Sequence, residues 1–159
     1  MQDNSRVGTT VIVGVLLVFA AVATDVITSV GGRSGKSRDM APIGSMKTIS
    51  AAQALFRESD KEQDGRHDYG TLTELSQHGQ LVDSLLGSGT KQGYTYQATY
   101  SARVPEFQWM ATAAPVSSAA GDRFFATNQD GVVYHTTAGP IPLDPDAPWP
   151  PAGCLPVGK

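Results

Sequence analysis

The hydrophobic positions change spacing along the chain, and each spacing predicts a different element. The segment from Val7 to Thr24 is apolar and carries no charge. At about 1.5 Å of rise per residue, a helix of this length crosses a hydrocarbon core of about 30 Å. Residues 1–30 are therefore predicted to form a hydrophobic helix that directs the chain to a membrane.

Two fates of this segment stay open. As an anchor, it continues past Asp25, which then lies near the membrane interface. As a signal peptide, Arg6 supplies the basic n-region and residues 21–23 (Ala-Val-Ala) the cleavage site, so that the mature chain starts at Thr24. Its length favours the anchor. Basic residues follow the span, and by the positive-inside rule they would favour a cytoplasmic C-terminus: Arg33, Lys36 and Arg38.

The next segments predict a linker and then an amphipathic helix. Residues 31–40 contain glycine and serine and predict a flexible linker or a broken helix. From Ala41 onward apolar residues recur every three or four positions: Ile43, Met46, Ile49, Ala52 and Phe56. Pro42 suits a first helical turn. This helix is expected to pack its apolar stripe on a sheet.

Two shorter helical turns follow. Thr71 and Glu74 have the spacing of a capping box, in which each side chain covers an unpaired backbone N–H. Gly79 is expected to end that helix, with His78 at its C-terminal end. A further turn is expected to end at Gly87, with these residues pointing inward: Leu81, Val82, Leu85 and Leu86.

The spacing then becomes that of strands. Apolar and polar residues alternate from Gly93 to Tyr100, which predicts a half-buried strand, and residues 105–115 form a second candidate. Residues 123–127 and 132–136 flank Asp130-Gly131, a preferred hairpin turn. The prediction is an α+β domain over residues 41–137, with a helix packed on three or four antiparallel strands.

The last segment, residues 138–159, is proline-rich and predicts an extended or disordered tail. Trp149 within it is either a docking residue or part of a solvated tail. Cys154 is the single cysteine, which excludes an intramolecular disulfide and a cysteine-based zinc site. It is interpreted as an incidental thiol.

Composition and motifs narrow the function. A net charge of −3 and a pI near 5.5 give no basic footprint for nucleic acid. His67, His78 and His135 do not belong to a G-x-S-x-G or H-E-x-x-H arrangement. The stretch GSGTKQG lacks the order of a phosphate-binding loop and precedes a strand. The chain is therefore expected not to be an enzyme.

The acidic stretch from Asp60 to Asp68 has the ligand spacing of the first part of a calcium loop. Counted from Asp60, oxygen ligands fall at positions one, three, five, seven and nine: Asp60, Glu62, Asp64, Arg66 through its carbonyl, and Asp68. Gly65 stands at position six, as the turn requires. Position eight is His67 in place of an apolar residue, and position twelve is Thr71 in place of the bidentate glutamate.

Two interpretations of this loop stay open. Without the bidentate ligand, a calcium site here would have a dissociation constant of around 10⁻⁴ to 10⁻³ M. Glu74 comes too late to close the loop and belongs to the capping box. The loop is either a weak calcium site or a solvated acidic turn between two helices, with no cofactor.

The order of these parts resembles type IV pilins and the pseudopilins of type II secretion. IGSMKTISAAQALF resembles the family's "LRTI-x-x-AQ" helix, and LVDSLLGSGTKQGYTY its "LID-x-x-LASGTK-x-GY" passage. ATAAP followed by GDRFFATNQDGVVYH resembles its "ATA-x-P" and hairpin strings. The likeness spans residues 41–135.

The N-terminus departs from the family pattern. Gly8 is followed by Thr9 and Thr10, so the first mature position lacks the family's phenylalanine and the fifth, Val13, its glutamate. The resemblance implies a structural or interaction subunit of a pilus or secretion apparatus, with other pilin-like subunits or secretion machinery as partners. The domain would lie on the periplasmic or extracellular side of an inner membrane. The alternative is a binding module secreted or released into the periplasm, which uses the sheet or the acidic loop for a ligand.

Overall fold

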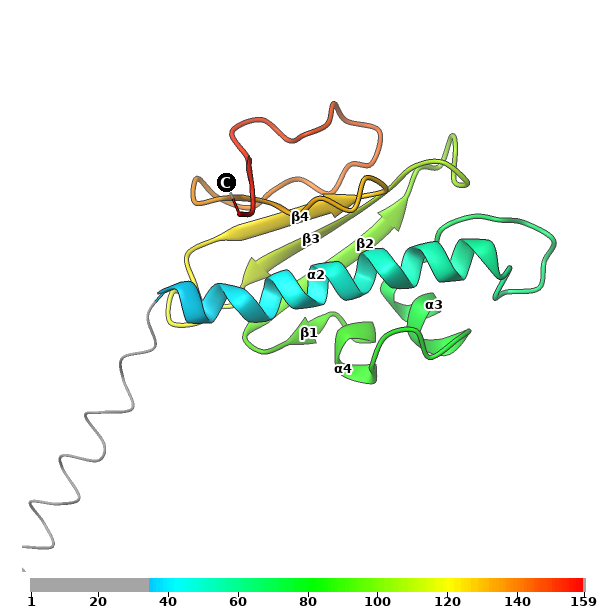
Figure 1. The fold of residues 1–159 in the computed structure, drawn as a ribbon, viewed down its shortest axis with the longest axis horizontal. Helices are drawn as coiled ribbons and strands as arrows, with labels where there is room; N and C mark the ends of the chain where they lie inside the picture. The colour runs from blue at the N-terminus through cyan, green and yellow to red at the C-terminus, as the bar shows by residue number, and fades with distance from the viewer. Residues whose placement is uncertain (1–34, 159) are drawn as a thin grey trace, which may run out of the picture. The chain divides into compact units, whose positions relative to one another are not determined.

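A long helix, α2 (Gly35–Glu58), lies across one face of an antiparallel sheet (Figure 1). The computed structural model describes residues 35–158, so the predicted hydrophobic helix of residues 1–30 lies outside the described residues. Within residues 35–158, no helix is both long enough and apolar enough to cross a membrane. The α+β class predicted from the sequence is confirmed for this part of the chain.

Helix α2 begins earlier than the sequence indicated. It starts at Gly35, so residues 35–40 are helical and the prediction of a linker or a broken helix there was wrong. Pro42 lies inside the helix and not in its first turn. A proline at that position removes one backbone hydrogen bond and costs about 3 kcal/mol. The side chain of Pro42 is fully buried, so packing on the sheet offsets part of this cost.

The inner face of α2 carries the predicted apolar stripe. Its buried members are Met46, Ile49, Ala52 and Phe56, whereas Ile43 is half-buried. Gln53 on the same face is fully buried as well: its Nε2 donates to the Gly70 carbonyl at 2.6 Å, and the Gly70 N–H donates to its Oε1 at 3.0 Å. This pair of bonds fixes the chain where it returns from the acidic loop.

Two short helices follow, α3 (Leu72–Gln77) and α4 (Ser84–Gly87). The predicted capping box is confirmed, since the Thr71 N–H donates to Glu74 Oε2 at 2.6 Å and the Glu74 N–H donates to Thr71 Oγ1 at 3.4 Å. Helix α4 is capped by Asp83, whose Oδ1 accepts from the Leu86 N–H at 3.1 Å. Leu85 is exposed, so its predicted inward position was wrong.

Within residues 35–158 the sheet has six strands in the order β1-β2-β3-β4-β5-β6, each antiparallel to its neighbours. Their bounds are β1 (Thr90–Lys91), β2 (Tyr94–Tyr100), β3 (Trp109–Pro115), β4 (Phe124–Asn128), β5 (Tyr134–Thr136) and β6 (Leu155–Pro156). The predicted strand at 93–100 and the predicted hairpin are confirmed as β2 and as β4 with β5. The prediction of three or four strands missed the two-residue strands at the sheet edges, because so short a stretch carries no alternation.

The two faces of the sheet are covered by different parts of the chain. Tyr94, Trp109 and Phe125 belong to the core beneath α2. Alternate residues such as Met110 and Ala126 point to the opposite face and are also buried. Figure 1 shows the orange and red C-terminal chain on that side of the sheet, away from α2.

The C-terminal segment, defined here as residues 138–158, follows an extended, mostly irregular path back to the sheet, so of the two predicted alternatives the disordered tail was wrong. It returns to the sheet as β6, and the Val157 N–H donates to the Val133 carbonyl at 2.8 Å. Trp149 packs edge-on against Tyr134, with ring centroids 5.4 Å apart. The prolines fit this irregular path because they have no N–H that would need a partner.

Candidate functional site

The acidic loop after α2 uses its carboxylates to hold its own backbone. Asp60 accepts from the backbone N–H of Asp64 at 3.2 Å and of Gly65 at 3.0 Å, and Asp64 accepts from the Arg66 N–H at 2.9 Å. Asp60 and Gly65 have positive φ angles, 41° and 80°. The Asp64 bond, to the N–H two residues further on, is that of an Asx turn, and the Asp60 bonds close a wider loop of four and five residues.

The structure does not bring the predicted ligands together around a cation position. Within residues 35–158, no three His, Cys, Asp or Glu side chains are placed to hold a metal ion. Partial burial, and then the charges of Glu74, Asp68 and Asp64, raise the pKa of Glu62. Partial burial, and then the charge of Asp64, also raises the pKa of Asp68. Repulsion between neighbouring carboxylates therefore contributes to both increases in pKa.

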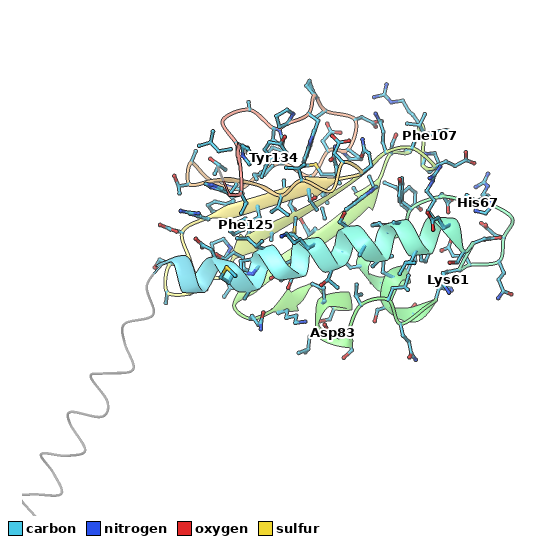
Figure 2. All side chains as sticks on the ribbon, in the orientation of Figure 1. Lys61, His67, Asp83, Phe107, Phe125 and Tyr134 are labelled. Carbon is cyan, nitrogen blue, oxygen red and sulfur yellow. The ribbon has the colours of Figure 1, made fainter. Side chains whose placement is uncertain are left out.

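His67 lies in the same loop, near the C-terminal end of α2 (Figure 2). Its Nδ1 lies 2.9 Å from the Arg57 carbonyl oxygen, so the ring closes the loop back onto the helix. The guanidinium of Arg57 lies over the Tyr69 ring, 5.6 Å from its centroid. These contacts give the loop a structural role as the connection between α2 and α3.

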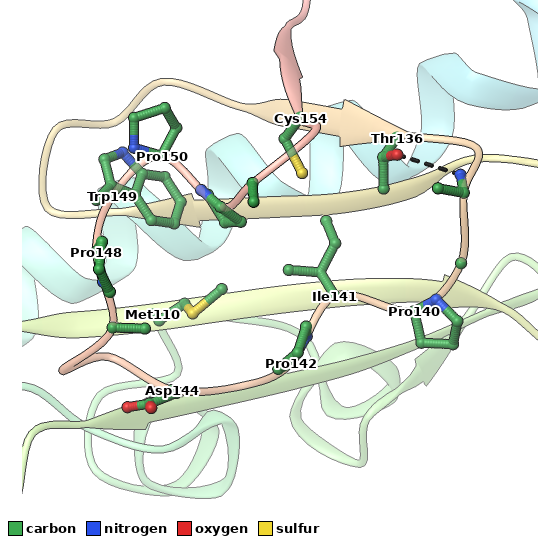
Figure 3. Close-up of a pocket in the computed structure, with 15 residues that line it drawn as sticks. Met110, Thr136, Pro140, Ile141, Pro142, Asp144, Pro148, Trp149, Pro150 and Cys154 are labelled. Carbon is green, nitrogen blue, oxygen red and sulfur yellow. Dashed lines mark hydrogen bonds between the residues drawn. The ribbon is translucent and has the colours of Figure 1, made fainter.

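A pocket of about 480 Å³ lies between the sheet and the C-terminal segment (Figure 3). Met110 of β3 and Thr136 of β5 contribute from the sheet, and the other lining residues come from the C-terminal segment. The larger apolar ones are Pro140, Ile141, Pro142, Pro148, Trp149, Pro150 and Pro151. The volume lies within the range of small-molecule sites, about 300 to 1,000 Å³.

The polar side chains of this pocket are few: two of them bond the neighbouring backbone, and Trp149 Nε1 is buried without a hydrogen-bond partner among the described residues. Burial raises the pKa of the Cys154 thiol, which therefore stays neutral at pH 7. Thr136 Oγ1 accepts from the Ala138 N–H at 3.1 Å, and Asp144 Oδ1 accepts from the Asp146 N–H at 3.0 Å. The pocket therefore has the character of an apolar binding site and contains no histidine that could activate Cys154.

A second polar cluster, which the sequence did not indicate, lies under the N-terminal part of α2. The carboxylate of Asp39 is buried, and its Oδ2 lies 3.3 Å from Arg123 Nε. The Tyr94 hydroxyl is buried without a hydrogen-bond partner among the described residues. Burial, and then the charges of Asp39 and Asp122, raise the pKa of Tyr94 to about 12.

One signal in the sequence could have found this cluster. Asp39 stands four residues before Ile43 and seven before Met46, so a helix that begins before Asp39 puts a carboxylate next to the apolar stripe. The glycines and serines of residues 31–37 hid this, because they weakened the helix prediction there.

Comparison of the chain with protein-family models, with curated proteins and with solved structures found no match.

Proposed function

We propose that this chain is a non-enzymatic, membrane-tethered, pilin-like subunit of a pilus or of a type II secretion-type apparatus. The observation that carries the proposal is the order of its parts. An apolar segment, residues 7–24, precedes a long helix that packs one face on an antiparallel sheet. Residues 41–135 also contain the strings that resemble pilins. The globular domain would lie on the periplasmic or extracellular side of the inner membrane.

The outer face of α2 supports a role in contacts between subunits. Met40 is 69% exposed and Leu55 is 50% exposed, and both lie on the helix face that turns away from the sheet. Small residues on that face leave its backbone accessible: Gly44, Ala51 and Ala54. Close approach of another helix needs such a surface.

Cysteine cross-linking in intact cells tests this role. In a Cys154→Ser background, the Ala51→Cys variant places one thiol on the outer face of α2, and oxidation is expected to give disulfide-linked dimers in the membrane fraction. The matched control is Gln129→Cys, an exposed position in the turn between β4 and β5. Equal, background-level cross-linking of the two variants would argue against a subunit that packs through α2.

The pocket under the C-terminal segment favours a second candidate function, a periplasmic or secreted binding module for an uncharged, apolar small molecule. Its lining is mainly proline, aliphatic and aromatic side chains on an ordered segment. The mature protein, isolated from cells, is titrated with the apolar fluorophore N-phenyl-1-naphthylamine. Ile141→Trp, which fills the pocket, should weaken binding about tenfold if the module exists. Leu155→Trp, at an exposed position outside the lining, is the control.

A further inference from the structure

The first turns of α2 are weakly connected to the rest of the helix. Pro42 has no N–H, so the Arg38 carbonyl receives no helical hydrogen bond from it. Gly44, in the next turn, adds backbone freedom and has open space around its Cα. Residues 35–41, the N-terminal section, therefore have a natural hinge at their C-terminal end.

An ion pair joins the N-terminal section to the chain that leads into β4. Asp39 is 5% exposed, and its carboxylate meets Arg123, which stands directly before β4. The Arg123 side chain is 37% exposed, so water reaches this partner but hardly reaches the carboxylate. The pair therefore joins a buried carboxylate on the helix to a partly exposed guanidinium.

Keeping the Asp39 carboxylate charged in this buried position costs free energy. Burial raises the pKa of Asp39, and the opposing effect of Arg123 does not cancel the rise. The charged and titratable groups that face it come from three elements. Arg123 and Asp122 lie before β4, His135 lies on β5, and Tyr94 lies on β2. Removal of the cation would leave Asp39 buried beside the like charge of Asp122.

We propose that the Asp39–Arg123 pair is a latch that docks the N-terminal section of α2 on the sheet. When the pair is broken, residues 35–41 swing out at Pro42 while residues 43–58 stay in place. The latch sets whether residues 35–41 lie on the sheet or away from it. It does not depend on whether residues 1–23 are kept or cleaved, because residues 35–41 are present in both forms.

Pulsed electron paramagnetic resonance on the full chain in detergent tests the latch. Nitroxide labels on Met40→Cys and Gln129→Cys, in a Cys154→Ser background, report the distance between the N-terminal section and the sheet. With the Asp39–Arg123 ion pair intact, these two labels are expected to give one narrow distance distribution. Arg123→Gln should raise the undocked population about tenfold or more, which appears as a second, broad component. A second label pair, on Ala51→Cys and Gln129→Cys, should keep its distribution, because Ala51 follows the hinge.

Two further variants separate a latch from general loss of stability. Asp39→Asn combined with Arg123→Gln should restore the narrow distribution, because no charge is then buried without a partner. Arg103→Gln is the matched control. It removes the Arg103–Asp146 pair, whose nitrogen–oxygen distance is 3.6 Å and whose arginine is 76% exposed, and it should leave both label pairs unchanged.

Three results would overturn the proposal. Arg123→Gln could leave the Met40–Gln129 distribution narrow, which would show that the pair does not hold the section. It could broaden both label pairs equally, which would show loss of the whole fold. The double variant could fail to restore docking, which would mean that Arg123 acts through a contact other than Asp39.

Discussion

The two ends of helix α2 differ in the exposure of the carboxylates that lie there. At its C-terminal end the acidic loop carries several carboxylates on a largely exposed turn, and two of them, Asp60 and Asp64, accept hydrogen bonds from backbone N–H groups. At its N-terminal end a single carboxylate, Asp39, is buried with Arg123 beneath the helix. The acidic stretch at the C-terminal end is visible as a motif in the sequence, whereas no motif indicates the ion pair at the N-terminal end. We therefore expect a substitution that removes a charge to displace the N-terminal end of α2, where the carboxylate is buried, and not the C-terminal end, where there are more carboxylates.

The largest effect is expected where Gly121 meets Tyr94 at the buried end. A Cβ at Gly121 would lie 2.0 Å from the Tyr94 hydroxyl oxygen, which has no room to retreat in a fully buried side chain. Gly121→Ala is expected to lower the free energy of unfolding by about 2–3 kcal/mol, measured by urea denaturation. Gly44→Ala, with nothing near its Cβ, should raise it by up to about 1 kcal/mol. If both variants behave alike, the packing around Tyr94 is looser than described.

The second largest effect is expected at high pH, where ionisation of Tyr94, near the N-terminal end of α2, should lower the free energy of unfolding. The folded chain raises the pKa of Tyr94 to about 12 from an ordinary 10.0, so it favours the neutral phenol. The resulting stability is fully present below pH 10 and is lost as the pH rises from 10 to 12, by roughly 2 kcal/mol. Tyr94→Phe should remove this part of the pH dependence in urea unfolding at pH 9 to 12. A profile that the substitution leaves unchanged would contradict the assignment to Tyr94.

At the other end, the capping box should matter more than the acidic turn that precedes it. Thr71→Ala removes the acceptor of the Glu74 N–H and is expected to cost about 1 kcal/mol in urea denaturation. Thr71→Ser keeps the hydroxyl and should cost only a few tenths of a kcal/mol. If Ala and Ser at this position are equal, the hydroxyl does not cap α3.

The smallest effect is expected for calcium at the acidic turn. A site with a dissociation constant of about 1 mM would raise stability by about 1.4 kcal/mol in 10 mM calcium. Because the described carboxylates do not converge on a cation position, the melting temperature is expected to be the same in 10 mM calcium chloride and in chelator. A rise in calcium that Asp60→Ala and Asp64→Ala both abolish would restore the calcium interpretation.

Local patterns were predictable from the sequence, and contacts between distant residues were not. Thr71 and Glu74 stand three residues apart, so their spacing alone defines the capping box. The alternation of β2 likewise depends only on neighbours. Asp39 and Arg123 are separated by most of the domain, and no spacing rule joins them. The pocket depends on how Trp149 and Ile141 fold back over the sheet, which the local preference of their neighbouring prolines does not encode.

The same limit applies to the acidic loop. Its ligand spacing from Asp60 to Asp68 matches the start of a calcium loop, yet spacing gives only the order of oxygen atoms along the chain. In the structure the carboxylates of Asp60 and Asp64 accept hydrogen bonds from backbone N–H groups of the turn, in which Asp60 and Gly65 have positive φ angles. The motif was visible in the sequence, but the geometry of the turn was not.

The mass of the mature N-terminus tests the central proposal most directly. Protein from the membrane fraction and from the soluble fraction is digested, and the N-terminal peptide of each is identified by mass spectrometry. A membrane-tethered, pilin-like subunit is expected to keep the apolar segment of residues 11–24, and to begin at Thr9 if it is processed after Gly8 in the manner of a prepilin. A mature chain that begins at Thr24 and is found in the soluble fraction would contradict the tether and leave the binding module as the better account.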